Sequence, residues 1–319
     1  MKVCFGLMVI VACLVLGSFA SAATFGTGAN EFTIDFVTIS GATNPASGYG
    51  IVNNDYRMGM HEITNDQWSK FKASVGGTVT GSPSYAYDSY PYFTGARVPT
   101  NNVSWYEAAQ FVNWLNTSTG YQAAYRFTGT QGTADYTLST WDAADAAGVT
   151  NLYRHKDAYY FLPPEHEWVK AAYWNGTNLQ TYAAKPSESL MHGDGTSGIG
   201  WNYYSDGSAT KPTCPWDVGS GSEELNGTYD MMGNVWEWME SPYSDTSYGT
   251  TSSRACRGGA FYNRSHTLAS SARNGDDPAF EYYGVGFRVA SSAAVAEPGS
   301  LIIWACGGFG ALLLKRRRK

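Results

Sequence analysis

The segment Asp230-Met-Met-Gly-Asn-Val-Trp-Glu-Trp238 brings two carboxylates, a Gly-Asn turn and two tryptophans within nine residues. Gly233-Asn234 favours a positive φ or a tight reversal, so that Asp230 and Glu237 face one turned backbone. Carboxylates and carbonyls are the oxygen ligands that Ca²⁺ takes, about six to eight at a time. The alternative is a hairpin with both tryptophans in the core and Glu237 in solvent. These nine residues alone do not decide between the two.

Several elements are predicted around this segment. Residues 32–39 alternate with β-branched and aromatic side chains and predict a strand, and residues 56–63 predict a second. Thr64, with Gln67 three residues later, predicts a helix that begins with a capping box. The clearest helix is predicted for residues 104–115, where Ser104 and Glu107 form a second capping box.

The later chain carries fewer regular signals. The prolines at 163 and 164 predict the start of a helix that carries Val169, Ala172 and Tyr173. Residues 118–150 are rich in Gly, Thr and Ala, which indicates a surface excursion of variable structure. No further helix is predicted in residues 198–288.

Both ends differ from the rest of the chain. Lys2, an apolar run and Ala20-Ser-Ala22 predict a secretory signal in residues 1–22. Residues 297–319 contain Glu-Pro-Gly, about fifteen apolar residues and a basic cluster, which together predict a short, marginal membrane anchor. This tail resembles the PEP-CTERM sorting signal of exported bacterial proteins, which an exosortase processes, although Ala296 stands where that signal usually has proline. One domain, residues 23–296, remains.

Composition restricts the partners of this domain. The formal net charge of the whole chain is −6, and six of its 21 basic residues lie in the two end segments, so the central domain is more acidic still. An acidic domain is a poor candidate for binding nucleic acid. Only Cys214 and Cys256 fall within it. They form either one disulfide or two buried free thiols.

Six segments, taken together, resemble the formylglycine-generating enzyme (sulfatase-modifying factor) family. They are Met60–Asn65, Val103–Ala109, Phe161–Trp168, Asp230–Trp238, Arg257–Ala260 and Gly286–Arg288. The resemblance implies an α+β fold related to C-type lectins, rich in loops and poor in regular secondary structure. The abundance of glycine and aromatic residues is consistent with this expectation.

In that family the Gly-Asn-x-Trp-Glu-Trp loop binds a structural Ca²⁺. By matching positions, the resemblance implies the side chains of Asp230 and Glu237 and the carbonyls of Gly233 and Val235 as ligands. A second calcium site is implied at Asn202, Tyr203, Asp206 and Ser208, where an ordinary Asx turn at Asp206 is the alternative.

The family's oxidase binds Cu(I) through two cysteines just beyond its Arg-Gly-Gly-Ser segment. This chain has neither, because Asn263 stands near the first cysteine position, Ala260 replaces the serine, and Cys256 precedes the glycines. An amide or hydroxyl cannot replace a thiolate pair at Cu(I). No catalytic residue and no copper are therefore expected.

Other side chains leave two interpretations open. Arg273 and Arg288 either line an anion-binding cleft or pair with acidic residues to close the fold. The cluster Phe261, Tyr262, Trp236 and Trp238 either offers sugar rings a stacking surface or packs in the core.

We therefore expect an exported domain of the bacterial cell envelope or surface, held at the membrane by its C-terminal segment until processing or release. Its expected role is a non-catalytic, calcium-stabilised binding or structural module. The expected partners are an exosortase-type enzyme and an exopolysaccharide or another surface protein. The alternative is a formylglycine-generating oxidase that converts a sulfatase cysteine.

Overall fold

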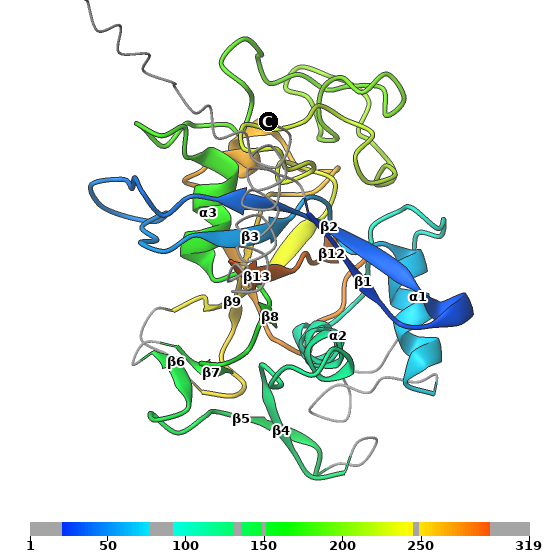
Figure 1. Ribbon diagram of the computed structural model, residues 1–319. Helices are drawn as coiled ribbons and strands as arrows, with labels where there is room; N and C mark the ends of the chain where they lie inside the picture. The colour runs from blue at the N-terminus through cyan, green and yellow to red at the C-terminus, as the bar shows by residue number, and fades with distance from the viewer. Residues whose placement is uncertain (1–20, 77–91, 131–134, 149–150, 245–248, 294–319) are drawn as a thin grey trace, which may run out of the picture.

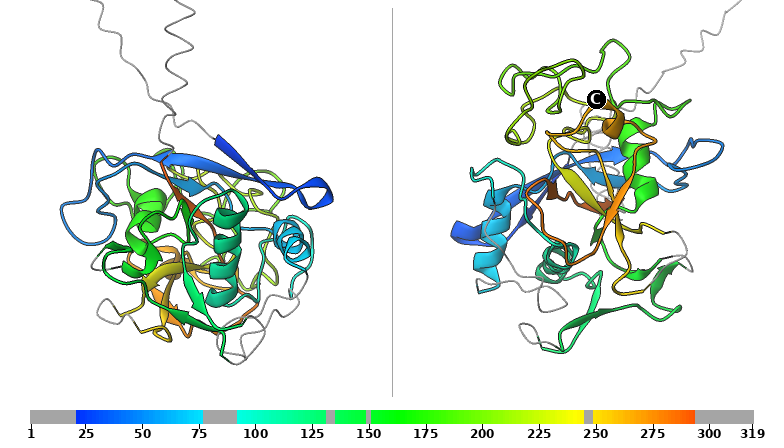
Figure 2. Two further views of the ribbon diagram at one scale, coloured as in Figure 1. Left: turned by 60° about the horizontal axis from the view of Figure 1, so that its bottom comes forward. Right: turned by 180° about the vertical axis from the view of Figure 1, so that it is seen from behind.

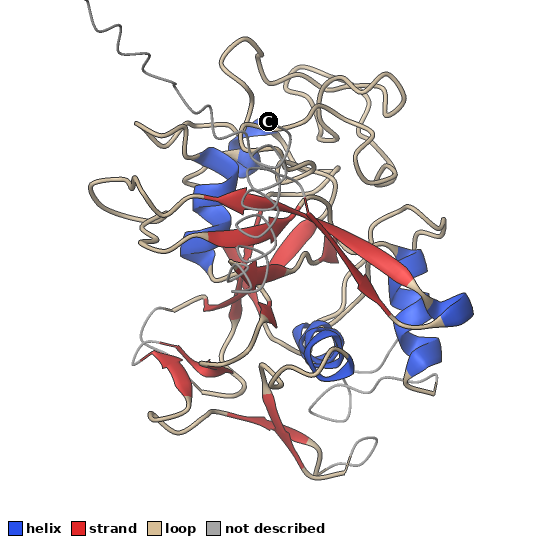
Figure 3. Cartoon of the chain, in the orientation of Figure 1, coloured by secondary structure: helices blue, strands red, loops and turns tan. Residues whose placement is uncertain are grey.

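The computed structural model describes residues 21–76, 92–130, 135–148, 151–244 and 249–293. Two sheets, two small hairpins and three α-helices are joined by long loops, which make up most of the described chain (Figure 3). This architecture is the loop-rich α+β fold that the sequence predicts. The predicted signal and sorting segments lie outside the described residues, apart from Ser21 and Ala22.

The larger sheet has five strands in the order β1-β2-β3-β13-β8, and all neighbours are antiparallel (Figure 1). Its strands are β1 (Ser21–Phe25), β2 (Phe32–Ile39), β3 (Tyr56–Gly59), β13 (Ala290–Ser292) and β8 (Tyr160–Phe161). In β2, Phe32, Ile34 and Phe36 are buried while the residues between them are exposed, as the alternating pattern predicts.

A second sheet has the order β11-β10-β9-β12. Its strands are β11 (Asn274–Asp276), β10 (Arg254–Arg257), β9 (Trp236–Pro242) and β12 (Val285–Gly286). Strand β9 runs antiparallel to β10 and parallel to β12. The predicted Asp230–Trp238 segment therefore leads directly into a central strand of this sheet.

Residues 118–150 contain more regular structure than the sequence suggests. They contain β4 (Arg126–Thr128), β5 (Thr137–Ser139) and β6 (Ala146–Gly148). Strand β4 pairs with β5, and β6 pairs with β7 (Asn151–His155), which follows the segment. Short strands of mixed composition give too weak a pattern to be recognised from the sequence.

The three predicted helices are present as α1 (Asn65–Ser74), α2 (Trp105–Ser118) and α3 (Glu165–Tyr173). Thr64 and Ser104 form the expected capping boxes with Gln67 and Glu107, and Pro164 precedes α3. The remaining helices described are short 3₁₀ turns at Gly28–Asn30 and Ser265–Leu268. Figure 2 shows the β1–β2 ribbon crossing over the helices. No helix in the described part of the chain is long and apolar enough to span a membrane.

The predicted second strand is shorter than expected. It ends at Gly59, where the N–H of Gly59 donates to Val289 O at 2.8 Å and a Cβ would come within 2.9 Å of that oxygen. Farther on, the Ile63 N–H donates to Phe287 O at 2.9 Å. The strand therefore ends because of contacts with residues 287–289, which are distant in the sequence, and the alternation of residues 56–63 cannot reveal such contacts.

Candidate functional site

The loop before β9 depends on three residues with left-handed backbone conformations. The φ angles are 60° at Asp230, 85° at Gly233 and 57° at Asn234. A Cβ on Gly233 would lie 2.2 Å from the carbonyl oxygen of Asn202, so glycine is required there. Asp and Asn are among the residues that tolerate this region best. The turn predicted from Gly233-Asn234 is therefore present.

Glu237 is completely buried and is held by three side-chain hydrogen bonds. Arg288 Nε donates to Oε2 at 2.7 Å and Arg288 Nη2 donates to Oε1 at 2.6 Å. Trp168 Nε1 also donates to Oε2, at 2.7 Å. Arg288 is equally buried, and it also donates to the carbonyls of Gly59 and Tyr229. The arginine therefore closes the fold through a bidentate ion pair.

Three further buried carboxyls lie close enough to Arg288 to interact with its charge: Glu62, Glu224 and Asp230. Burial, as the main cause, raises the pKa of Asp230 to about 6 and that of Glu224 to about 8. Burial, together with the charges of Asp230 and Glu237, raises the pKa of Glu62 well above its usual range. One guanidinium thus lies near four buried carboxyls, and burial favours the protonated form of Glu62 and Glu224.

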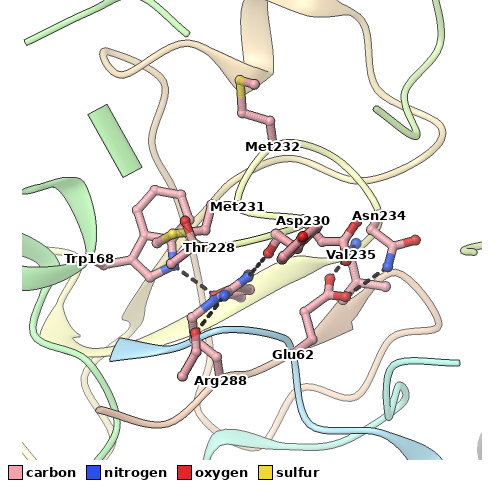
Figure 4. A network of polar contacts seen from close by, with 12 residues as sticks. Glu62, Trp168, Thr228, Asp230, Met231, Met232, Asn234, Val235 and Arg288 are labelled. Atoms are coloured by element: carbon pink, nitrogen blue, oxygen red, sulfur yellow. Dashed lines mark hydrogen bonds and ion pairs between the residues drawn. The ribbon is translucent and has the colours of Figure 1, made fainter. Parts of the chain in front are cut away.

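Glu62 was not predicted as a site residue. Its Oε2 accepts a hydrogen bond from Asn234 Nδ2 at 2.7 Å, and its Oε1 accepts from the Val235 N–H at 3.2 Å (Figure 4). An acidic residue in an otherwise apolar approach to a helix cap is the signal that could have revealed it.

The residues of the first implied calcium site, as they lie, do not fit an ion. Both oxygens of Glu237 are bonded to Arg288 or Trp168, and Asp230 Oδ2 accepts from the Gly219 N–H at 2.7 Å. Across the described residues, no group of three or more His, Cys, Asp or Glu side chains is arranged to hold a metal. Calcium therefore has no part in the function proposed below.

The residues of the second implied calcium site differ in burial and are mostly bonded to other groups. Asn202 is buried, and its Oδ1 has no hydrogen-bond partner among the described residues. Asp206 is exposed instead, where it lies 3.5 Å from Arg264 and accepts from Ser265 Oγ. Ser208 Oγ donates to Thr210 O, and Tyr203 is buried. Only Asn202 offers an orphaned oxygen, which is too few ligands for Ca²⁺.

The two cysteines of the domain are both free, so of the two alternatives left open by the sequence the disulfide is not formed. Cys256 is buried in β10, and burial raises the pKa of its thiol well above the usual value. Cys214 is exposed, contrary to the alternative of two buried thiols. At the position of the family's first copper cysteine, Asn263 Oδ1 accepts from the Ala260 N–H at 2.9 Å and fixes the turn.

Arg273 also pairs with an acidic residue. Its guanidinium forms a bidentate contact with Glu165 at 2.7 and 2.8 Å, and Arg257 Nε donates to the same carboxylate at 2.6 Å. Glu165 and Arg257 are almost completely buried. The pairing interpretation therefore holds for both Arg273 and Arg288.

An aromatic groove with a volume of about 320 Å³ lies beside the turn that contains Asn263. It is lined by Tyr92, Phe93, Lys211, Pro212, Thr213, Phe261, Tyr262 and Tyr283. Tyr92 is 69% exposed, while Tyr262 and Tyr283 are half-buried. We call this feature the aromatic groove.

Two buried asparagines position the groove. Asn101 Oδ1 accepts from the backbone N–H groups of Tyr92 and Phe93 at 2.8 and 3.1 Å. On the other wall, the Phe261 N–H donates to Asn234 O at 2.9 Å. The loop before β9 thus supports the groove from behind.

Of the four aromatic residues singled out in the sequence, three are core residues. Trp236, Trp238 and Phe261 are buried, and only Tyr262 offers accessible surface in the groove. Tyr92 and Tyr283 were missed because they come from distant parts of the chain. The adjacent tyrosines at 282 and 283 were the available signal.

These features define an α+β domain that contains a Gly-Asn turn, a buried Arg–Glu pair and an aromatic groove, one wall of which is bonded to that turn through Asn234 and Phe261. Residues 14–293 match the sulfatase-modifying factor enzyme 1-like domain, and the chain belongs to this family. No curated protein matches the chain.

Solved structures share the fold. Treponema denticola variable protein 1 is 20% identical, with a TM-score of 0.57 over 85% of this chain and 99% of that one. CarF is 23% identical, with a TM-score of 0.57, and the match covers 82% of this chain and 99% of CarF. PvdO from Pseudomonas aeruginosa is 15% identical, with a TM-score of 0.52, and the match covers 85% of this chain and 98% of PvdO. At these identities the likeness concerns the fold alone.

Proposed function

We propose that this chain is a non-catalytic binding module of the sulfatase-modifying factor family, and that the aromatic groove is its binding surface. One observation carries the proposal: the family's copper-cysteine region contains Asn263 and Ala260, and these lie beside an open groove of aromatic side chains. Cu(I) requires soft ligands such as thiolates, and an amide is a hard one.

The nearby thiols give little support to oxidase chemistry. Cys256 is buried in β10 with a raised pKa, so it is protonated at neutral pH and closed to solvent. Cys214 is the one exposed thiol in the described residues, and a single thiolate is half of the ligand pair that the family uses. The oxidase remains the alternative because Cys214 directly follows the groove residue Thr213.

We further propose that the domain works outside the cytoplasm, on the envelope or the surface of a bacterial cell. The support comes from the sequence, which has a signal-like segment at residues 1–22 and an anchor-like segment at residues 297–319. An exosortase-type enzyme is the proposed processing partner. Fractionation of the producing cells, with the chain detected in the cytoplasm alone, would contradict this location.

The catalytic alternative has a direct test. Purified chain is incubated with a Cys-x-Pro-x-Arg peptide and Cu(I), and mass spectrometry measures conversion of the peptide cysteine to formylglycine. An active family oxidase serves as the positive control, and the Cys214→Ser variant as the matched one. We expect no conversion. Conversion that disappears in Cys214→Ser would establish an enzyme and overturn the proposal.

A further inference from the structure

We propose that the aromatic groove binds an acidic polysaccharide, a chain of hexose rings that carry carboxylates, such as a polyuronate. This inference rests on the proposed binding function and adds the class of ligand. It draws on three features of the groove: the arrangement of its rings, the charge of its lining and the rigidity of its walls.

The groove presents several aromatic rings at different inclinations. The Tyr92 and Tyr283 rings lie 5.3 Å apart at 37°, and those of Tyr262 and Tyr283 lie 5.8 Å apart at 61°. Phe93 packs edge-on against Phe261 at their base. Tyrosine offers an apolar ring face together with a hydroxyl, which suits a ligand with C–H faces and a rim of hydroxyls. A pyranose ring has this combination.

The hydroxyl of Tyr262 keeps its proton at neutral pH. Burial, and then the neighbouring Tyr282 and Tyr283, raise the pKa of Tyr262 above its usual value. Next to the groove, the Tyr282 hydroxyl donates a hydrogen bond to Tyr283, and this bond, with desolvation, raises the pKa of Tyr282 to about 12. The Tyr262 hydroxyl is therefore available as a donor and acceptor to sugar hydroxyls.

The lining of the groove carries a positive charge, whereas the chain as a whole is negatively charged. The whole chain has a net charge of −6, yet the lining residues that the structure describes include Lys211 and no carboxylate. Asp276, which does not line the groove, is close enough to contribute to the raised pKa of Tyr262. Lys211 Nζ lies 5.0 Å from the centre of the Tyr262 ring, and within the described residues Lys211 forms no ion pair. A local positive charge in an acidic protein favours an anionic ligand. The ring face below it fits a sugar that carries a carboxylate.

The walls are already in place for binding. Asn101, which is 2% exposed, holds the backbone of Tyr92 and Phe93. Gly284 lets Tyr262 pack against the backbone, because a Cβ there would come within 2.4 Å of the tyrosine ring. A preorganised groove loses little entropy on binding. Its open shape suits a segment of a longer chain better than an enclosed small molecule.

Affinity electrophoresis tests this inference. Purified full-length chain is run through native gels that contain polygalacturonate, or dextran as the neutral glycan, at two salt concentrations. Isothermal titration with oligogalacturonate gives the dissociation constant. We expect retardation by polygalacturonate that weakens with salt and little retardation by dextran.

Variants locate the binding on the molecule. Tyr262→Ala and Tyr283→Ala should each weaken binding about tenfold, because each removes a stacking ring. Lys211→Gln should weaken polygalacturonate binding about three- to tenfold and remove most of its salt dependence. Tyr121→Ala and Lys156→Gln are the matched controls, since both residues are exposed and lie outside the groove. Circular dichroism confirms that each variant is folded.

The outcomes separate this inference from the proposed function. Retardation by dextran through the same tyrosines would overturn the acidic ligand class and leave a binding module. Displacement of polygalacturonate by a proline-rich peptide with higher affinity would likewise show a peptide groove. Absence of retardation, or retardation that survives both tyrosine variants, would overturn the inference. The formylglycine measurement tests separately whether the chain is non-catalytic, and retardation that survives both tyrosine variants would also remove the aromatic groove as the binding surface of the proposed function.

Discussion

Arg288 and Glu237 form a bidentate ion pair in which neither side chain is exposed to solvent. The arginine comes from the segment before β13 and the glutamate from β9, so the pair links the two sheets. Trp168 from α3 completes the set of bonds to the carboxylate. A bidentate guanidinium fixes the direction of approach as well as the distance.

Replacement of Arg288 by Met should destabilise the domain severely. The change leaves the Glu237 carboxylate buried without its counter-charge, which costs about 3–5 kcal/mol. Urea unfolding followed by tryptophan fluorescence measures the loss. Lys185→Met is the control, because its pair with Glu223 is largely exposed and should contribute less than about 1 kcal/mol. Similar effects of the two variants would contradict the assigned role of Arg288.

Removal of divalent cations should leave the melting temperature unchanged. The oxygens of Glu237 are already bonded to Arg288 and Trp168, so the loop before β9 does not need an ion to neutralise that carboxylate. Differential scanning fluorimetry with EDTA, and then with added Ca²⁺, makes the comparison. A fall in EDTA that Ca²⁺ restores, and that Glu237→Ala abolishes, would show that the calcium site implied by the family exists here.

Stability should fall as the pH rises from about 6.5 to about 8. Burial raises the pKa of Glu167 to about 7 and that of Glu224 to about 8, so both bind a proton in the folded state that they lack when unfolded. More protons on the folded state mean that the free energy of unfolding decreases as pH rises through these values. Burial lowers the pKa of His61 to about 4. This histidine therefore makes the free energy of unfolding rise with pH, but only below its unfolded pKa, so it does not offset the decrease expected above pH 6.5.

Glu167 allows a specific check of this pH dependence. Its Oε2 is buried and has no hydrogen-bond partner in the described structure, so replacement of this oxygen breaks no bond. Glutamine and a protonated glutamic acid are both neutral, so Glu167→Gln leaves the charge unchanged when the carboxyl is protonated. Between pH 6.5 and pH 8, the free energy of unfolding should decrease by about 1 kcal/mol less in the variant than in the unaltered chain. Urea titrations at the two pH values measure this difference. An unchanged slope would show that Glu167 is ionised in the folded protein.

Asn234→Gly should also destabilise the domain, although glycine suits the backbone at that position. Asn234 donates to Glu62 and Trp216 and accepts from Trp216 and Asn202, and all four bonds would be lost. The expected cost is about 2–4 kcal/mol, since buried partners are left unpaired. Asn54→Gly, at an exposed asparagine with one long bond, is the control. A loss below about 1 kcal/mol would mean that water replaces these bonds.

The sequence predicted features whose causes are local. The helices α1 and α2 were recognisable because Thr64 with Gln67, and Ser104 with Glu107, form capping boxes within one turn. The turn at Gly233 was recognisable because left-handed backbone favours Gly and Asn. The fold class followed from six motifs in order, and the family match confirms it.

The features that escaped prediction depend on distant contacts. The Glu237–Arg288 pair joins residues 51 positions apart, and the bond from Asn234 to Glu62 spans 172 positions. The groove likewise combines Tyr92 with Tyr262 and Tyr283. No local periodicity carries such information, so the sequence suggested Glu237 as a metal ligand where the structure shows it bound to an arginine.

The position of β13 has a consequence for biosynthesis. Ala290–Ser292 pairs with both β3 and β8, so the last described strand of the chain joins the edge strand β8 to the rest of the larger sheet. Until these residues leave the ribosome, β3 and β8 lack the strand that lies between them. The domain can therefore reach its native state only after residues 290–292 have left the ribosome, and nascent chains must stay protected from aggregation until then.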